Sequence, residues 1–171
     1  MSPRHICFSH GLDSGPWGTK IRAMANAAVG AGWSVESLDY QGLRDPAKRV
    51  ARLLRHLREL RGAPVLVGSS MGGFVSVAAA SRHASAGLFL LAPALYVPGY
   101  AEQLPELPTC PTTIIHGWRD EVVPWADSVR YAAQVRARLV LLDGDHRLTA
   151  NVGEICRHLL AFLAERAATA C

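Results

Sequence analysis

Three residues along the chain have the types and the order that nucleophilic acyl chemistry needs. Ser70 lies in the segment GSSMG (68–72), which has the pattern G-x-S-x-G and follows the apolar run 63–67. A serine hydroxyl is a weak nucleophile, so it needs a base to take its proton and an acid to orient that base. Asp120 and His146 follow in the order Ser…Asp…His. This order predicts a triad with Ser70 as nucleophile, Asp120 as acid and His146 as base.

The glycines around Ser70 suit a nucleophile held on a sharp turn between a strand and a helix. The backbone of such a turn is strained and crowded, so residues without a Cβ must flank it. The helix that follows directs backbone N–H groups at the negative charge that develops on an attacked carbonyl oxygen. G-x-S-x-G also arises by chance, and the alternative is a Gly/Ser turn without chemistry. The residues that follow the other strands therefore decide between the two interpretations.

Glu121, Asp143 and Asp145 are alternatives to Asp120 as the acid. Asp145 adjoins His146, and neighbouring side chains usually point apart, so Asp145 is poorly placed to orient the imidazole. The spacing favours Asp120, which lies just after a predicted strand.

Two further histidines also follow apolar runs. We expect His10 to shape the loop that would bind an oxyanion and His116 to brace the turn that carries the acid. A metal site of nitrogen and oxygen ligands is a further alternative; its ligands would be His10, Asp13, His116, Asp120 and His146. No two of these histidines have the spacing of HExxH, and a metal would leave the Ser70 pattern unexplained, so we expect no metal.

The elements that must position these residues alternate between apolar runs and helical stretches. Strands are expected at 6–8, 33–40, 63–69, 87–92, 112–116 and 139–142, and helices at 18–31, 44–61, 71–83, 125–137 and 150–167. The strand candidates are continuously apolar rather than alternating, which is typical of strands buried on both faces of a parallel sheet. We therefore predict a single α/β domain over residues 1–171, a three-layer α/β/α sandwich.

Ligands of such folds bind beyond the carboxyl ends of the strands. Polar and ionisable residues gather there in this chain, in the segments HGLDSG (10–15), GSSMGG (68–73), HGWRDEVVP (116–124) and DGDHR (143–147). One edge of the sheet is therefore expected to carry the site.

Four of these motifs resemble the alpha/beta hydrolase superfamily, and in particular its small lidless bacterial serine esterases. They are FSHG (8–11), GSSMGG (68–73), HGWRDEVVP (116–124) and GDH (144–146), and the resemblance that rests on them spans nearly the whole chain. The resemblance implies the triad named above, with an oxyanion hole formed by the backbone N–H groups of Leu12 and Met71. It also implies about six strands in the order 2-1-3-4-5-6. The chain starts at what would be the third strand of larger members, and the segment 94–111 is too short for a cap domain.

These expectations describe a serine hydrolase that cleaves small or short-acyl carboxylic esters through an acyl-enzyme, without a cofactor or metal. A thioesterase or peptidase with the same triad is an alternative, because the acyl chemistry is shared. A non-catalytic binding module on a hydrolase scaffold is another.

Candidate pocket residues are His10, Asp13, Trp17, Tyr96 and Trp118. Asp13 could equally cap the following helix, and the two tryptophans could simply pack the loops.

The composition and the distribution of charge indicate which classes of binding partner to expect. The 171 residues carry a formal net charge of +4 and a pI of about 9.1. Much of the positive charge lies in 44–61, where apolar residues repeat at helical spacing, so a solvated basic face is favoured over an anion- or partner-binding one. No aromatic residues are interleaved there to stack on bases. We expect a small-molecule ester as the partner and neither nucleic acid nor membrane; a monomer and a homodimer both remain open.

The N-terminus and the cysteines indicate the compartment. The start, MSPRHICFSHG, has no apolar run of signal-peptide length, and no stretch approaches the roughly 20 apolar residues that span a membrane. A cytoplasmic location is therefore expected. The cysteines at 7, 110, 156 and 171 form no CxxC pair. In a reducing compartment they are interpreted as small hydrophobic residues rather than as disulfide partners or zinc ligands.

Overall fold

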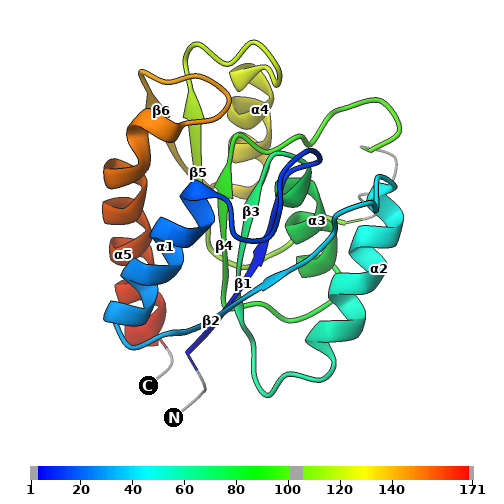
Figure 1. Cartoon of the computed structure of the whole chain (residues 1–171), viewed down its shortest axis with the longest axis vertical. Coiled ribbons are helices and arrows are strands. Elements are labelled where there is room, and N and C mark those ends of the chain that lie inside the picture. The colour runs from blue at the N-terminus through cyan, green and yellow to red at the C-terminus, as the bar shows by residue number, and fades with distance from the viewer. Residues whose placement is uncertain (1–3, 101–105, 170–171) are drawn as a thin grey trace.

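The computed structural model describes residues 4–100 and 106–169, and its centre is one parallel sheet of six strands (Figure 1). The strands are β1 (His5–Ser9), β2 (Ser34–Leu38), β3 (Val65–Ser69), β4 (Gly87–Leu91), β5 (Thr112–Gly117) and β6 (Arg138–Leu142). Their order is β2-β1-β3-β4-β5-β6, and every neighbouring pair is parallel. The predicted fold class and strand order are confirmed.

Helices cover both faces of this sheet, as Figure 1 shows. Their bounds are α1 (Thr19–Gly30), α2 (Pro46–Leu57), α3 (Met71–Ala80), α4 (Trp125–Val135) and α5 (Val152–Thr169), with a 3-10 turn, η2 (Thr149–Asn151), before α5. One apolar layer joins α1 and α5 to the sheet and includes Met24, Phe89 and Phe162. The other layer joins α2, α3 and α4 to the opposite face and includes Leu53 and Phe74. The molecule is therefore a three-layer α/β/α sandwich.

The central strands are buried on both faces, as their continuous apolar runs predict. Every residue of β4 and β5 is buried, and so are the first four residues of β3. The edge strands β2 and β6 are only partly buried. Because all six strands are parallel, their carboxyl ends meet at one edge, which is the upper edge in Figure 1. None of the described helices is long and apolar enough to cross a bilayer.

The basic helix predicted over 44–61 is shorter than expected. The Asp45 side chain caps it by accepting the N–H groups of Ala47 and Lys48, and Pro46 occupies its first turn. Such a cap and proline define a helix start, and α2 ends at Leu57.

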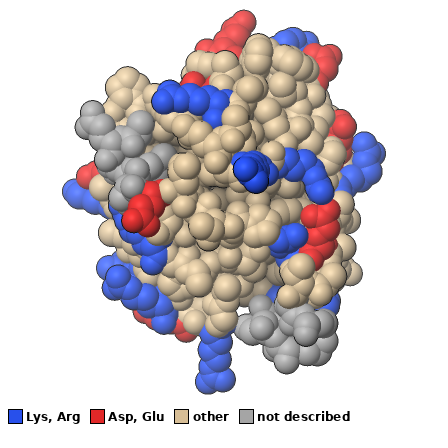
Figure 2. Space-filling view, turned by 180° about the vertical axis from the view of Figure 1, so that it is seen from behind, with Lys and Arg blue, Asp and Glu red and all other residues tan. Residues whose placement is uncertain are grey.

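On the face seen in Figure 2, Lys and Arg are scattered among acidic and uncharged residues rather than gathered into one patch.

Candidate active site

Ser70 lies on a sharp turn between β3 and α3. Its φ of 55° and ψ of −120° place it in a region that residues with a Cβ rarely adopt, at a cost of about 1–3 kcal/mol. Neighbouring backbone holds this conformation from both sides. The Ser70 N–H donates to the Leu91 carbonyl at 2.9 Å, and the Ser70 carbonyl accepts the N–H of Ala94 at 3.0 Å. The end of β4 thus fixes the serine in its strained conformation.

The glycines beside Ser70 are required by close contact. A Cβ at Gly72 would overlap the carbonyl oxygen of Ser9, and a Cβ at Gly68 would overlap that of Gly72. The start of α3 therefore lies directly against the end of β1. This is the crowding that the G-x-S-x-G pattern predicted.

A chain of hydrogen bonds joins the three residues singled out in the sequence. His146 Nε2 lies 3.1 Å from Ser70 Oγ, and His146 Nδ1 lies 2.7 Å from Asp120 Oδ2. A carboxylate only accepts, so the Nδ1 carries the proton in this arrangement and Nε2 presents its lone pair to the serine hydroxyl. The structure therefore brings together side chains from the turns after β3, β5 and β6.

Asp120 is surrounded by hydrogen-bond donors. Its Oδ1 accepts the N–H groups of Val122 and Val123, each at 2.8 Å, while its Oδ2 accepts from His146 and from His116 Nε2 at 2.9 Å. Burial acts to raise the pKa of Asp120, but the hydrogen bonds outweigh burial and leave the pKa below its usual 3.8. The carboxylate is therefore ionised at neutral pH, and its orientation is fixed.

His116 is a fully buried support for this acid. Its Nε2 lies near two acceptors, Asp120 Oδ2 and the Val123 carbonyl at 3.0 Å, so this nitrogen carries the proton. Its Nδ1, 2.7 Å from Ser128 Oγ, then accepts the serine hydroxyl. Burial lowers the pKa of His116 and keeps the ring neutral. The geometry fits the predicted role of bracing the acid turn.

The other candidate acids are engaged elsewhere. Asp143 is exposed and pairs with Arg119 at 2.9 Å. Asp145 accepts the N–H of Leu148 at 2.9 Å, which shapes the turn after His146. Glu121 is exposed. Among these carboxylates, the described structure brings only Asp120 into hydrogen-bonding contact with His146.

The loop after β1 passes beside Ser70. A Cβ built on Gly11 would lie 3.6 Å from Ser70 Cβ. His10 is fully buried at the base of this loop; its Nδ1 donates to the Gly11 carbonyl at 2.7 Å, and its Nε2 accepts the N–H of Tyr40 at 2.9 Å. Burial lowers the pKa of His10. His10 therefore shapes the loop, as predicted, and is too enclosed to line a pocket mouth.

Arg49 is a buried arginine that sequence reasoning missed, with only 1% of its surface exposed. Its guanidinium donates to the carbonyls of His10 and Gly11, each at 3.1 Å, and of Leu12 at 3.3 Å. One planar group thus holds three successive carbonyls of the loop after β1. A signal was present, because Arg49 stands four and eight residues before Leu53 and Leu57, on the apolar stripe of α2.

Lys20 brings a positive charge close to the turn of Ser70. Its Nζ lies 3.2 Å from Ser69 Oγ, the residue before the proposed nucleophile. Burial lowers the pKa of Lys20 to about 8, although the carboxylates of Asp145 and Asp120 act in the opposite direction. No sequence pattern pointed to this lysine, because the contact joins residues 49 positions apart.

The remaining candidate pocket residues are spread over the rim. Asp13 is exposed and pairs with Arg44 at 3.2 Å. Trp17, 42% exposed, lines a shallow hollow beside Arg22 and Asn26 rather than the Ser70 turn. Tyr96 donates to Gln134 at 2.9 Å. Trp118 is 49% exposed and stacks edge-on against Trp125. Trp118 thus packs against the first residue of α4, and the roles of both tryptophans in substrate contact stay predictions.

The comparisons with known proteins agree with this geometry. A family model described as the alpha/beta hydrolase family matches residues 8–168. The chain belongs to the alpha/beta hydrolase family. A solved structure from Xanthomonas campestris pv. campestris, ascribed to the alpha/beta hydrolase superfamily, is 32% identical, with a TM-score of 0.87 over 95% of this chain and 99% of that one. No curated protein matches the sequence significantly.

More distant alpha/beta hydrolases share the fold. Est1E from Butyrivibrio proteoclasticus is 19% identical, with a TM-score of 0.85 over 98% of this chain and 89% of that chain, and a second structure of Est1E holds ferulic acid. A monoacylglycerol lipase from Paleococcus ferrophilus is 15% identical, with a TM-score of 0.77 over 96% of both chains. At these identities the likeness concerns the fold alone.

Proposed function

We propose that this alpha/beta hydrolase is a serine hydrolase that cleaves carboxylic esters through an acyl-enzyme on Ser70. The observation that carries the proposal is the hydrogen-bond chain from Ser70 Oγ through His146 to Asp120, which ends on a strained serine. A structural Gly/Ser turn has no need of a base and an oriented acid behind its hydroxyl. Nucleophilic catalysis needs all three.

The first step follows from the proton positions. His146 Nε2 takes the proton of Ser70 Oγ as this oxygen attacks the ester carbonyl. Asp120 remains ionised because its four hydrogen-bond donors stabilise the carboxylate, so it stabilises the imidazolium that forms. His116 and Ser128 keep that carboxylate in place without contacting the substrate.

The tetrahedral intermediate carries negative charge on the former carbonyl oxygen. We assign its stabilisation to the backbone N–H groups of Met71, at the start of α3, and of Leu12, in the loop that Arg49 holds. His146 then gives its proton to the leaving alcohol. A water molecule that passes a proton to His146 attacks the acyl group, and the acid leaves as Ser70 regains its proton.

Small or short-acyl esters are the substrates proposed. The connection between β4 and β5 spans only residues 92–111, so it is short for a cap domain over the site. Two proteins with the same fold support this proposal. One is named a monoacylglycerol lipase, and the other, Est1E, has been solved with ferulic acid bound. Ester cleavage is therefore the reaction to test first.

The deciding experiment compares wild type, Ser70→Ala and Ser69→Ala. Each is assayed with p-nitrophenyl acetate and butyrate and labelled with a fluorophosphonate probe. Ser70→Ala should lose labelling and at least about 10³-fold of kcat/KM. Ser69→Ala, its matched neighbour, should keep both within about tenfold, because its hydroxyl contacts Lys20 rather than His146.

The outcomes separate the alternatives. Labelling of the wild type with faster turnover of thioesters or amides would keep Ser70 as nucleophile and reassign the substrate. A wild type that neither labels nor turns over any acyl substrate would overturn the proposal and favour a binding module. Strong activity on long-chain emulsions with none on short esters would overturn the short-acyl assignment.

A further inference from the structure

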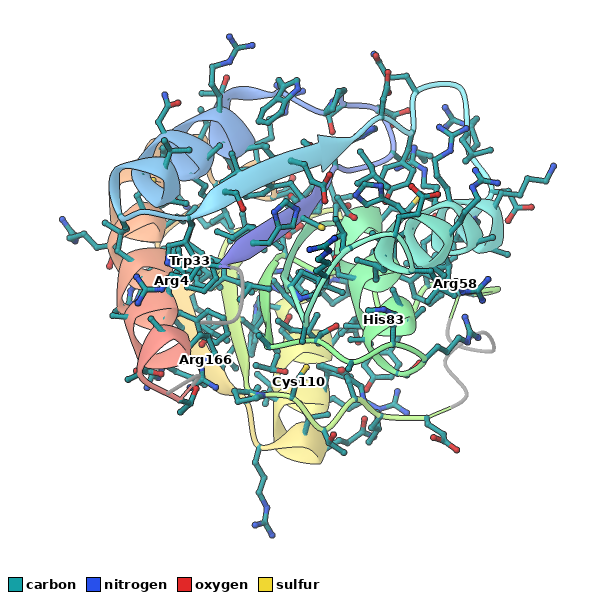
Figure 3. All side chains as sticks on the ribbon, turned by 90° about the horizontal axis from the view of Figure 1, so that it is seen from below. Arg4, Trp33, Arg58, His83, Cys110 and Arg166 are labelled. Atoms are coloured by element: carbon teal, nitrogen blue, oxygen red, sulfur yellow. The ribbon has the colours of Figure 1, made fainter. Side chains whose placement is uncertain are left out.

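A second cluster of reactive side chains lies on β1 and β2, away from Ser70. The parallel register pairs His5 with Ser34 and Cys7 with Glu36. His5 and Cys7 alternate with Ile6, so both side chains point to the face of the sheet that α2 and α3 cover. His56 approaches the same point from α2. Figure 3 views this end of the sheet, where Arg4 and Trp33, the residues before β1 and β2, lie close together.

One carboxylate oxygen is the centre of the cluster. Glu36 Oε1 lies 2.6 Å from His5 Nε2, 2.9 Å from Cys7 Sγ and 2.6 Å from His56 Nε2. A carboxylate oxygen offers about two lone-pair sites, so it cannot accept well from three groups. His56 Nε2 is buried and, despite its short distance, does not meet hydrogen-bond geometry with any partner. Hydrogen bonding alone therefore leaves the cluster incompletely satisfied.

His5 is oriented by a hydrogen bond at the ring nitrogen that does not face Glu36. Its Nδ1 lies 2.8 Å from Ser34 Oγ, and the Ser34 hydroxyl also donates to the Arg4 carbonyl at 3.0 Å. A hydrogen bond at the outer ring nitrogen is how proteins orient a metal-binding histidine. This contact directs His5 Nε2 at the Glu36 carboxylate, 2.6 Å away.

We propose that His5 Nε2, Cys7 Sγ, the Glu36 carboxylate and His56 Nε2 form a binding site for one divalent zinc-like ion. Nitrogen, thiolate sulfur and carboxylate oxygen are the donors that zinc takes in proteins, usually four in a tetrahedron. The ligand atoms of His5, Cys7 and Glu36 all lie within 4.8 Å of one another. Zinc bonds of about 2.0–2.3 Å place tetrahedral ligand atoms roughly 3.3–3.8 Å apart, so Glu36 Oε1 must move by about 1 Å from its present place between the other three atoms.

The ion would act on structure rather than on the ester. Its ligands come from the first and middle residues of β1, from the edge strand β2 and from α2, whereas the loop that passes Ser70 follows the carboxyl end of β1. Binding would therefore tie the half-buried edge strand to the centre of the sheet and to the helix that carries Arg49. The Cys7 thiol gives up its proton to solvent when the metal–sulfur bond forms. This assignment departs from the sequence interpretation of Cys7 as a small hydrophobic residue.

The test is metal binding by tag-free, full-length protein from which a chelator has removed metals. Zinc chloride is titrated by calorimetry, and cobalt chloride is followed by absorption, because cobalt bound to a thiolate gives a strong charge-transfer band. The wild type should bind one zinc per chain with a Kd of about 0.1 μM or lower and should melt at a higher temperature with zinc. Cys7→Ser should lose the cobalt–thiolate band and at least about 100-fold in affinity.

Matched controls locate the ion. Cys156→Ser and His83→Asn change a cysteine and a histidine outside the cluster and should bind as the wild type does; His83 is labelled in Figure 3. Ser70→Ala should also bind normally, so this result is independent of the proposed hydrolysis. Should Cys7→Ser fail to fold, the site is tested by the zinc affinity of the wild type and by Glu36→Gln, which should bind zinc more weakly than the wild type. A wild type that binds zinc no tighter than about 10 μM, or a Cys7→Ser variant that keeps the cobalt band, would overturn the site.

Discussion

At the scale of single residues, Arg49 shows how a buried charge can stabilise a loop with no acidic side chain paired to it among residues 4–100 and 106–169. Its side chain faces the carbonyls of His10, Gly11 and Leu12 and crosses the ring of Tyr40 at 5.2 Å. Several carbonyl dipoles replace the water that a guanidinium would otherwise bind. The loop thereby gains a fixed shape in which the N–H of Leu12 can serve an oxyanion.

Replacing this arginine tests that dependence. Arg49→Lys keeps the charge but loses the planar group that reaches three carbonyls at once, so the loop should loosen. We expect kcat/KM for p-nitrophenyl acetate to fall about 10- to 100-fold, because small displacements of an oxyanion donor are costly. Fluorophosphonate labelling should slow but persist. Arg52→Lys, on the exposed face of α2, is the control and should act like wild type. Equal activity of the two variants would contradict the role of Arg49.

The acid can be tested in the same assay. Asp120→Asn leaves a side chain of the same shape but removes the charge that stabilises the imidazolium, so kcat should fall by about 10³-fold or more. Asp143→Asn changes an exposed carboxylate paired with Arg119 and should leave kcat within about twofold. If the Asp143 variant were the inactive one, the acid assignment would have to move.

At the scale of elements, the contact between α3 and β1 sets the geometry of the site. The helix starts so close to the strand that Gly72 has the Ser9 carbonyl where a Cβ would be. Neither element can shift without moving both Ser70 and the loop at 10–12. Close backbone contact, rather than a large side-chain interface, therefore aligns the proposed nucleophile with its proposed oxyanion donors.

Two glycine variants separate this contact from helix propensity. Gly72→Ala should lower the free energy of unfolding by about 3 kcal/mol or more, because a backbone carbonyl cannot move aside as a side chain can. Gly30→Ala, at the end of α1, meets nothing within 4 Å and should be neutral or stabilising by up to about 1 kcal/mol. Urea unfolding followed by circular dichroism measures both. A Gly72→Ala variant as stable as wild type would exclude the tight contact.

Sequence patterns predicted the elements better than their ends or their long-range contacts. Continuous apolar runs identified β3 and β4 because both faces of those strands are buried. The strand expected over 33–40 is shorter, Ser34–Leu38, because Tyr40 is buried beyond the end of the strand by contacts that no local pattern shows. Ser70, Asp120 and His146 carry recognisable motifs. Lys20 and the cluster around Glu36 carry none, since their partners are assembled only by the fold, and Arg49 is marked only by its place on the apolar stripe of α2.

At the scale of the whole molecule, two buried histidines link stability to pH. His10 and His116 are both fully buried, and burial lowers the pKa of each from 6.5. The folded protein keeps them neutral where the unfolded chain would take up protons. Their contribution to stability is therefore complete above about pH 6.5 and is lost as the pH falls toward the folded pKa values.

The prediction is a loss of stability in mild acid. Between pH 7.5 and 5.0 the free energy of unfolding from urea titrations should fall by about 2 kcal/mol or more. His83→Asn, which removes a histidine hydrogen-bonded only at the surface, should show the same fall as wild type. A constant free energy over this range would mean that His10 and His116 take up protons in the folded protein as readily as in the unfolded chain, so that burial does not lower their pKa values.

The first and last helices of the chain, α1 and α5, lie side by side on one face of the sheet (Figure 1). During synthesis, the apolar side of α1, with Met24 and Ala28, must therefore wait for the final helix to cover it. The turn of Ser70 is complete once β4 has formed, well before His146 leaves the ribosome. Under the proposed mechanism, a growing chain would carry its serine in place but unactivated, and reactivity toward esters would arise only after His146 has reached it.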